Sequence, residues 1–378
     1  MRRNPFKPSA GVNPPLLVGR EQVLADFQQG LFNGVGDPHR LLRITGNRGA
    51  GKTVLLNALG EKAASLKWQV IHETATAGLV VRLIHALHPT PRRLVKSVSL
   101  PGVGIEGLAS ASLGGFELSD PVIPATLREA LNKRLDEITR KDPERGILLT
   151  IDEVQGADQA ELRAIATTVQ HLIRENRNIA VVFAGLPGMD STLLHDDVIT
   201  FLRRAFPVVL KDISLDLVKD SFVQVFGNNG KTLTQRALEV ATSATRGYPF
   251  MIQLVGYHIW NKSGDSYLVE TDHANQGVDA AMIRLGETVH EPAVSDLSAV
   301  DRTFLLAMAQ DAGPSRMKDI CQRINRNGQY ANQYRQRLID AGVIEESGYG
   351  YVDFTIPYLR NWLKSHQASV RLRDHINK

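Results

Sequence analysis

Two alternating hydrophobic patterns run along the first half of the chain. Five short segments are almost continuously apolar: RLLRIT (40–45), WQVIHET (68–74), GILLTID (146–152), IAVVFAG (179–185) and FPVVL (206–210). Runs of this length predict strands that are covered on both faces. The segments between them carry apolar residues at helical spacing, as Leu162, Ile165, Val169 and Leu172 do within 159–175. Strands alternating with helices predict a three-layer α/β domain with a parallel sheet.

The second half of the chain has a different pattern. Residues 214–290 are helical throughout, which predicts a small helical subdomain. Residues 290–301 have the composition of a linker. Beyond them, three helices (301–311, 317–324 and 330–341) precede two short strands (343–346 and 351–356), the order of a winged helix-turn-helix. We expect domains at 1–213, 214–290 and 297–366, followed by a basic tail at 367–378.

Two segments interrupt this organisation. The first fifteen residues contain four prolines and predict an extended arm. Residues 101–116 contain five glycines among small residues, which predicts an insertion or a loop between elements of the α/β domain.

Composition excludes several classes of protein. The 378 residues are 43% hydrophobic and 22% charged, as in an ordinary globular protein of two to three domains. A single cysteine, Cys321, excludes an internal disulfide framework and suits a cytoplasmic location. No apolar run is long enough for a membrane span, and the basic N-terminus lacks the apolar core of a signal peptide.

The distribution of charge says more than the net charge of +4. Residues 316–378 hold 11 basic and 6 acidic side chains, whereas the remainder holds 33 and 34. The basic excess therefore lies in the C-terminal region, which favours an anionic partner there.

The strongest chemical signal is GNRGAGKT, which matches the phosphate-loop pattern G-x-x-x-x-G-K-[ST] between a strand and a helix. Glycines permit the tight turn, and the N–H groups of the loop and the helix N-terminus wrap phosphate oxygens. Lys52 is expected to reach the β- and γ-phosphates of ATP or ADP, and the Thr53 hydroxyl to ligate Mg²⁺. The predicted nucleotide-binding residues of this segment are Gly46, Asn47, Arg48, Gly49, Ala50, Gly51, Lys52, Thr53 and Val54.

A second signal ends the strand at 146–152. Asp152 and Glu153 follow a buried apolar run, at the carboxyl end where α/β sheets bind ligands. Asp152 is the expected Mg²⁺ partner of Thr53, and Glu153 the base that activates a water. This pair favours hydrolysis of the nucleotide over phosphate transfer to a second substrate.

Together these motifs resemble the additional-strand P-loop ATPases of the AAA+/STAND group, and more narrowly a prokaryotic AAA family allied to origin-recognition ATPases. The segment PPLLVGRE (14–21) resembles a box that lies by the adenine in that family, which implies nucleotide contacts for Leu17, Val18, Gly19 and Arg20. GYP (247–249) resembles the G-x-P motif of a helical lid, which implies that Pro249 touches the base or sugar. FLRRAF (201–206) precedes the last strand, so Arg203 and Arg204 are candidate arginine fingers, acting in cis or in trans within a homo-oligomer.

One position departs from the family pattern. The strand IAVVFAG carries Ala184 and Gly185 where relatives have a polar residue that orients the attacking water. The resemblance therefore implies slow hydrolysis.

The C-terminal region carries the candidates for DNA binding. Arginine, lysine, asparagine and glutamine hold phosphates or read base edges. The predicted contact residues are Lys318, Arg323, Arg326, Gln333, Arg335, Arg337 and Tyr349. Glu345 and Glu346 oppose this interpretation, since they would repel phosphate, and winged helices of STAND proteins often bind protein instead.

The sequence thus predicts an ATP-binding, slowly hydrolysing ATPase whose nucleotide state positions a winged helix on duplex DNA. The alternative is a signalling switch or scaffold of the STAND type, whose winged helix binds a protein partner.

Overall fold

A parallel five-stranded sheet organises the first half of the chain. The computed structural model describes residues 2–9, 11–87, 126–189, 203–367 and 370. The strands are β1 (Leu41–Gly46), β2 (Gln69–Thr74), β3 (Ile147–Asp152), β4 (Ile179–Gly185) and β5 (Phe206–Leu210). Their order in the sheet is β2-β3-β4-β1-β5, with every pairing parallel. All five predicted strands are confirmed, and β4 is the additional strand between β1 and β3.

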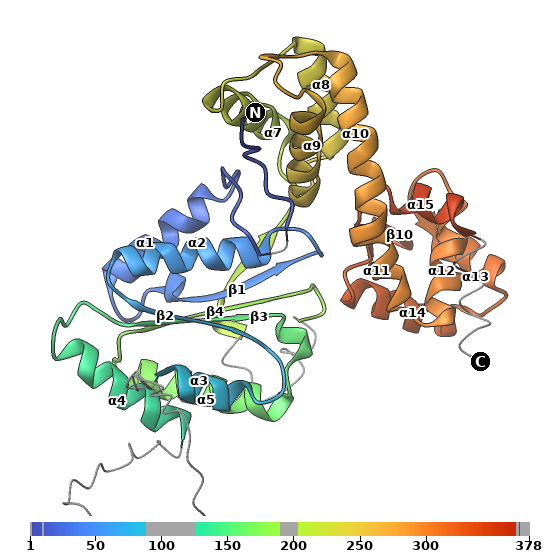
Figure 1. Ribbon diagram of the computed structural model, residues 1–378. Coiled ribbons are helices and arrows are strands. Elements are labelled where there is room, and N and C mark those ends of the chain that lie inside the picture. The colour runs from blue at the N-terminus through green and yellow to red at the C-terminus, as the bar shows by residue number, and fades with distance from the viewer. Residues whose placement is uncertain (1, 10, 88–125, 190–202, 368–369, 371–378) are drawn as a thin grey trace, which may run out of the picture.

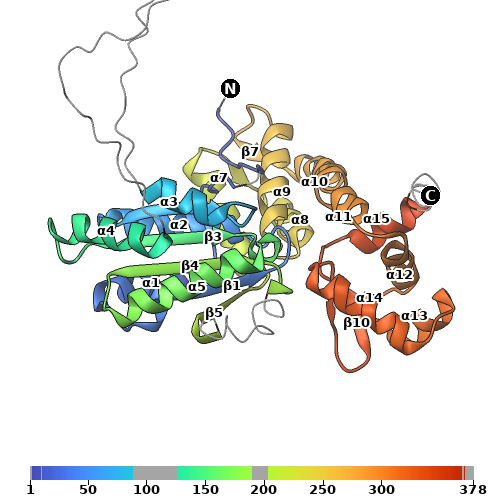
Figure 2. The same cartoon turned by 90° about the horizontal axis from the view of Figure 1, so that it is seen from below.

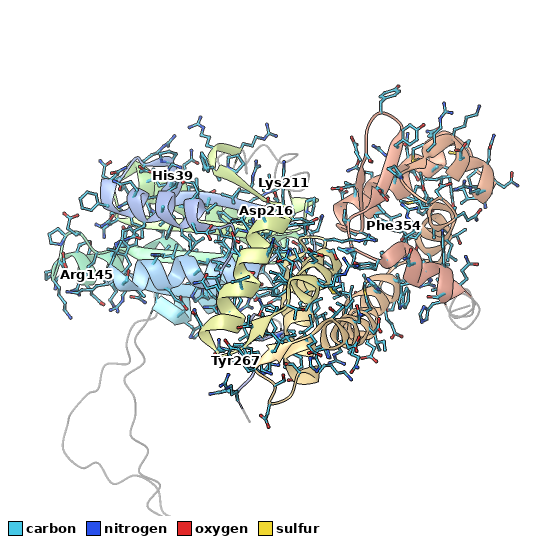
Figure 3. The ribbon with its side chains drawn as sticks, turned by 90° about the horizontal axis from the view of Figure 1, so that it is seen from above. His39, Arg145, Lys211, Asp216, Tyr267 and Phe354 are labelled. Carbon is cyan, nitrogen blue, oxygen red and sulfur yellow. The ribbon has the colours of Figure 1, made fainter. Side chains whose placement is uncertain are left out.

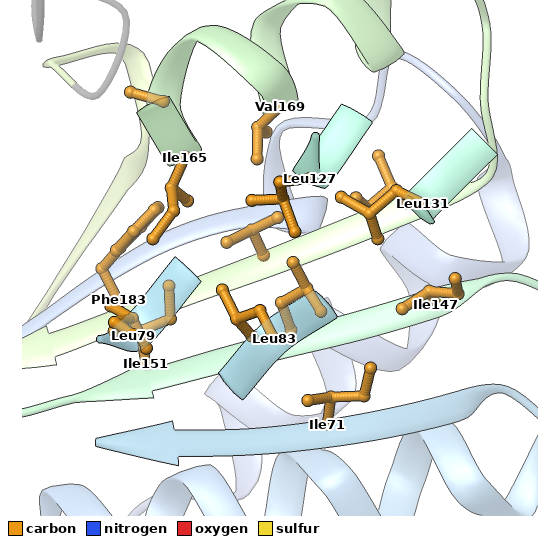
Figure 4. Close-up of a cluster of buried hydrophobic side chains, with 14 of the residues drawn as sticks. Ile71, Leu79, Leu83, Leu127, Leu131, Ile147, Ile151, Ile165, Val169 and Phe183 are labelled. Carbon is orange, nitrogen blue, oxygen red and sulfur yellow. The ribbon is translucent and has the colours of Figure 1, made fainter. Parts of the chain in front are cut away.

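Helices cover both faces of this sheet (Figures 1 and 2). One face packs against α1 (Glu21–Asn33) and α2 (Lys52–Ser65), through residues such as Phe27 and Leu55. The other packs against α3 (Leu79–Leu87), α4 (Leu127–Thr139) and α5 (Gln159–Arg174). Neighbouring residues of β3 alternate between the two cores, since Leu148 faces the first, whereas Ile147 and Leu149 face the second. Figure 4 shows Ile147 and Ile151 of β3 within the second core. The three-layer architecture is therefore confirmed. The glycine-rich segment 101–116 lies outside the described residues.

The lid is a helical unit that follows β5. It consists of α7 (Leu215–Asn228), α8 (Gln235–Thr245), α9 (Pro249–Lys262) and α10 (Thr271–Leu285), with a two-stranded ladder of β6 (Thr232–Leu233) and β7 (Leu268–Val269). Phe6 of the N-terminal arm is 3% exposed and packs among Phe222 and Phe226 of α7. The arm is therefore part of the lid's core rather than a free extension.

The C-terminal domain joins the lid through continuous helical structure. A π-helical turn (Gly286–His290) and α11 (Glu291–Ser295) continue α10, so the segment 290–301, which was predicted to be a linker, is largely helical. Apolar contacts explain the difference, because Ala293 and Val294 are 2% exposed in the domain core. Figures 1 and 2 show α10 and α11 leading from the lid to this domain.

Three helices and a small antiparallel sheet form the domain itself. The helices are α12 (Ala299–Ala309), α13 (Met317–Ile324) and α14 (Gly328–Asp340). The strands β8 (Ser315–Arg316), β9 (Ile344–Glu346) and β10 (Tyr351–Phe354) pair in the order β8-β10-β9, and α15 (Leu359–Ser365) follows. The predicted order of three helices before a hairpin is present. Figure 3 labels a residue in each unit: Arg145 in the α/β core, Tyr267 in the lid and Phe354 here. Within the described part of the chain, no helix has the length and hydropathy of a membrane span.

Candidate nucleotide site

The phosphate loop connects β1 to α2 at the carboxyl edge of the sheet. Gly49 and Gly51 have φ of +74° and +90°, the left-handed region that glycine enters without steric cost. Gly51 is the N-cap of α2, and no side chain caps the first turn. The first N–H groups of a helix have no intrahelical partner, and together with the helix dipole they attract anions. The loop therefore has the geometry of a phosphate cradle.

Lys52 supplies a buried cation beside this cradle. Its side chain is 6% exposed, and Nζ donates to the carbonyls of Gly46 (2.9 Å) and Asn47 (3.1 Å). Burial lowers the pKa of Lys52 below its ordinary value, against the opposing effect of Glu153 and Asp152. A phosphate group in the cradle would provide the anionic partner that the two neutral carbonyls do not.

Thr53 and Asp152 bring two oxygen ligands together from elements far apart in sequence. The Thr53 hydroxyl donates to Asp152 Oδ2 over 2.6 Å, and Asp152 Oδ1 accepts from the N–H of Glu153. Hydroxyl and carboxylate oxygens are the ligands that Mg²⁺ prefers. These two residues fit a Mg²⁺ ion held jointly with nucleotide phosphates. Among the described residues there is no separate cluster of three metal-ligating side chains.

Glu153 stands at the end of β3 in an uncommon backbone conformation. Its φ and ψ are 55° and 41°, a left-handed geometry that costs energy for a residue with a side chain. Its side chain is exposed and borders the same pocket as the phosphate loop. Strained backbone of this kind clusters at functional sites, so the conformation supports the predicted role of Glu153.

The lid contacts the phosphate loop directly through Tyr248. This side chain is 2% exposed, and its hydroxyl donates to the carbonyl of Arg48 over 2.7 Å. Burial raises the pKa of the Tyr248 phenol well above its ordinary value, so the hydroxyl stays protonated. The next residue, Pro249, is the first of α9 and lines the pocket. The GYP motif predicts a contact for its proline only, so the contact made by Tyr248 is additional to the predicted ones.

A cavity of about 690 Å³ lies between the phosphate loop, the lid and the N-terminal arm. Its size is in the range of small-molecule and cofactor sites. The predicted residues that line it are Leu17, Val18, Arg20, Arg48, Gly49, Ala50, Gly51, Lys52, Thr53, Val54, Glu153 and Pro249. The arm lines it as well, which the sequence did not indicate, through Phe6, Lys7, Pro8, Ser9, Gly11 and Val12.

The arm reaches the cavity because it is fixed at both ends. Asn4 donates to the carbonyl of Tyr257 in α9, and Asn57 of α2 donates to the carbonyl of Gly11. The arm therefore runs between the lid and the α/β core, and its residues form part of the cavity wall.

The other predicted nucleotide residues lie near the cavity in different roles. Arg20 donates to the carbonyl of Lys211 at the end of β5, which anchors the predicted box to the core. Gly19, Gly46 and Asn47 are outside the cavity lining, although Gly46 and Asn47 hold Lys52. Asp152 borders a smaller hollow of about 380 Å³ on the other side of Thr53.

The two candidate arginine fingers lie far from this cavity. Arg203 and Arg204 are exposed and directly precede β5, whose first residue pairs with Leu42 near the start of β1. The phosphate loop follows the opposite end of β1, so strand length separates the arginines from it by about 13 Å or more. Neither arginine lines the cavity, and a finger role for them, in cis or in trans, stays a prediction.

The C-terminal domain rests against the nucleotide site. The N–H of Gly188, just after β4, donates to the carbonyl of Asp340 at the end of α14 over 3.3 Å. A Cβ atom on Gly188 would lie 2.6–2.8 Å from Asp340, so the two backbones are in close contact. Arg48 of the phosphate loop lies 3.7 Å from the carboxylate of Asp296. The hydroxyl of Tyr358 donates to the carbonyl of Ala244 in the lid.

Ion pairs engage three of the predicted DNA-binding arginines. Arg323 pairs with Asp311, Arg335 with Glu346, and Arg337 with Asp301, whose side chain is 3% exposed. Both partners of each pair lie in the C-terminal domain. The number of basic residues in this region did not indicate that these three arginines are paired. The other four predicted residues are exposed: Lys318 on α13, Arg326 between α13 and α14, Gln333 on α14, and Tyr349 in the turn between β9 and β10.

Comparisons with known proteins agree with this architecture. Residues 16–182 match the family model described as the AAA ATPase domain, and residues 287–363 match one described only as a domain of unknown function. The Walker-type ATPase of Pyrococcus abyssi superposes with a TM-score of 0.65 at 16% identity, covering 92% of this chain and 96% of that one. The ORC2 protein of Aeropyrum pernix, solved in ADPNP and ADP complexes, gives 0.58 at 14% identity, with 97% of each chain covered. No curated protein sequence matches the chain.

These similarities confirm the predicted resemblance and the predicted fold class. The AAA ATPase domain covers the phosphate loop and the Asp152–Glu153 pair. The two solved structures share the whole succession of α/β core, helical region and small C-terminal domain.

Proposed function

We propose that this chain binds ATP with Mg²⁺ in the cavity between core, lid and arm, hydrolyses it slowly, and uses the nucleotide state to position the C-terminal domain on duplex DNA. The observation that carries the proposal is the convergence of Lys52, Thr53, Asp152 and Glu153 on one edge of the sheet, beside a cavity of about 690 Å³.

Each of these residues has a distinct task in the proposed reaction. Lys52 neutralises charge on the phosphates, and the first turn of α2 holds them through N–H groups. Thr53 and Asp152 would hold Mg²⁺, which when bound supplies charge neutralisation to the leaving phosphates. Glu153 accepts a proton from the water that attacks the terminal phosphate. Ala184 and Gly185 offer no polar side chain of their own to orient that water, which supports slow turnover.

The contacts around the site suggest how nucleotide state reaches the C-terminal domain. Arg48 belongs to the phosphate loop, yet its carbonyl binds Tyr248 of the lid and its guanidinium faces Asp296 next to the C-terminal domain. Gly188, three residues beyond the end of β4 at Gly185, contacts Asp340 of α14. A shift of the phosphate loop would therefore change the contacts of Arg48, and a shift of the residues after β4 would change the contact of Gly188. A ligand that binds one arrangement more tightly increases the population of that arrangement.

Exposed Lys318, Arg326 and Tyr349 support DNA as the ligand of the C-terminal domain. Lysine and arginine on a helix and its turn contribute phosphate contacts, whose strength falls with salt. The three internally paired arginines support the second candidate, a protein partner, because their charge is already neutralised. In either case, we propose Arg203 and Arg204 as arginine fingers, acting in cis or in trans within a homo-oligomer.

The central experiment measures ATP binding and turnover of the full chain with and without duplex DNA across a salt series. We expect Mg²⁺-dependent ATP turnover, stimulated by DNA, and loss of ATP binding in Lys52→Ala. Lys62→Ala, on the same helix, is the matched control. Tight ATP binding by Lys52→Ala would refute the phosphate-loop role, and ATP turnover without DNA binding at low salt would favour the protein partner.

A further inference from the structure

The carboxyl end of β4 is occupied by a side chain from another element. Ala184 and Gly185 supply no polar group there, but the side chain of Gln155 lies beside them. Gln155 belongs to the single 3₁₀ turn (Val154–Gly156) that follows β3 and Glu153. The side-chain amide of Gln155 therefore lies at the end of β4, where the sequence of the strand itself provides no polar side chain.

Gln155 connects β4 to the candidate catalytic carboxylate. Its Oε1 accepts a hydrogen bond from the N–H of Leu186 over 3.0 Å, and its Nε2 donates to Oε2 of Glu153. One side-chain amide thus uses its acceptor to fix itself to the strand end and its donor to hold the carboxylate. A donor fixed in this way restricts the orientations of Glu153, which is otherwise exposed.

The apolar residue at the end of β4 is what makes room for this arrangement. A Cβ atom on Gly185 would lie 2.7 Å from Gln155 Oε1, closer than two such atoms approach. It would also lie 2.9 Å from Sδ of Met189. Glycine at 185 and glutamine at 155 are therefore complementary: a polar side chain on β4 and the bridging glutamine would compete for one space.

We infer that Gln155 is a positioning residue for ATP hydrolysis, which orients the Glu153 carboxylate and substitutes for the polar side chain that β4 lacks. This inference rests on the proposed function. It also links the base to the β4 exit, where Gly188 contacts the C-terminal domain.

Three variants test this role against a purely structural one. Gln155→Ala removes both hydrogen bonds and should lower kcat about tenfold or more, while KM and the Kd of ATP stay within about twofold. Gln155→Glu keeps an acceptor for Leu186 but places a second carboxylate beside Glu153. Since adjacent carboxylates retain a proton to higher pH, the acidic limb of its kcat–pH profile should move to higher pH.

The third variant, Gly185→Ser, tests the shared space. Alone it should lower kcat, because its side chain displaces Gln155. Combined with Gln155→Ala it should cause no further loss, since the space is then free, and thermal unfolding of all variants checks that they fold. Independent, additive losses would overturn the inference, as would an unchanged kcat in Gln155→Ala or an unchanged pH profile in Gln155→Glu.

The two levels of the argument fail differently. If the wild-type chain does not turn over ATP, hydrolysis itself is refuted and the role of Gln155 falls with it. If the wild type is active and Glu153→Gln is inactive, but the Gln155 variants behave like the wild type, only the inference about Gln155 is refuted.

Discussion

The hydroxyl of Tyr248 donates a hydrogen bond to the backbone carbonyl of Arg48 over 2.7 Å, across 200 residues of sequence. This contact joins the lid to the phosphate loop at the wall of the cavity. The position of the lid is thereby tied to the conformation of the loop that is proposed to hold the phosphates.

Removing this hydroxyl should weaken ATP binding. Tyr248→Phe keeps the ring but leaves the Arg48 carbonyl without its partner, a loss of about 1 kcal/mol, or about fivefold in Kd. Equilibrium binding of ATP measures the change. Tyr267→Phe, at an exposed lid position, is the control and should bind ATP like the wild type. Equal affinity in all three proteins would contradict a role of this hydrogen bond.

Replacing the candidate base should separate binding from catalysis. Glu153→Gln preserves shape but cannot take a proton, so ATP binding should persist while kcat falls about 10²–10⁴-fold. Glu144→Gln, which precedes β3 at the other edge of the sheet, should leave kcat unchanged. Turnover assays on the three proteins make the comparison, and wild-type turnover by Glu153→Gln would refute the assignment.

A single methyl group should detach the C-terminal domain. In Gly188→Ala the added Cβ would meet the backbone of Asp340 at 2.7–2.8 Å, which requires α14 to move away. We expect a larger radius of gyration in solution scattering and faster proteolysis between the lid and the C-terminal domain. Gly227→Ala is the control, since a Cβ there meets nothing within 4 Å. An unchanged radius would show that the contact does not hold the domain.

Acid should destabilise the junction between the lid and the C-terminal domain. Burial lowers the pKa of His290 from 6.5 to about 4, and nearby His366 adds to the effect, while Nε2 donates to the carbonyl of Pro357. The unfolded chain therefore binds the proton more readily. The stabilisation is full above about pH 6.5 and is lost as the pH falls toward 4, by up to about 3 kcal/mol.

Denaturant unfolding between pH 4 and 7 measures this dependence. His290→Gln retains a donor for Pro357 without a titrating group, so its stability should change less across this range than that of the wild type. His85→Gln, exposed on α3, should follow the wild type. A wild-type slope in His290→Gln would place the acid sensitivity elsewhere.

Charge removal in the C-terminal domain should have two different effects. Lys318→Ala and Arg326→Ala should each weaken DNA binding and reduce the salt slope by about 1, as expected for lost phosphate contacts. Arg337→Ala should instead lower stability by about 1–3 kcal/mol, because it leaves the buried Asp301 without its cation. Lys133→Ala on α4 is the control for both measurements. DNA affinity that depends on Arg337 but not on Lys318 or Arg326 would reverse this assignment.

Much of the site could be predicted because it is built from local sequence. The phosphate loop is one continuous segment whose glycines, lysine and threonine act through spacing alone. The Asp152–Glu153 pair is equally local, since a buried apolar run fixes the strand and its end fixes the carboxylates. The five strands and the succession of domains followed from hydrophobic period in the same way.

Contacts between distant segments could not be predicted in this manner. No spacing rule brings Tyr248 to Arg48, the arm to the cavity, or Asp340 to Gly188, because such contacts depend on how completed elements pack. Gln155 is the instructive case. Its sequence position, two residues after Glu153, was visible, but its partner at the end of β4 was not, because the parallel sheet brings the β3 and β4 ends together.

The sequence by itself therefore determined which chemical groups the chain has for phosphate binding and on which elements they lie. Only the tertiary structure decided which of those groups are free to act. In the folded chain, carboxylates pair with Arg323, Arg335 and Arg337. Arg203 and Arg204 lie outside the lining of the cavity, and the side chain of Gln155 occupies the space beside Gly185. The physical reason is that charge and hydrogen-bonding capacity are properties of a residue, whereas their satisfaction is a property of its neighbours in space.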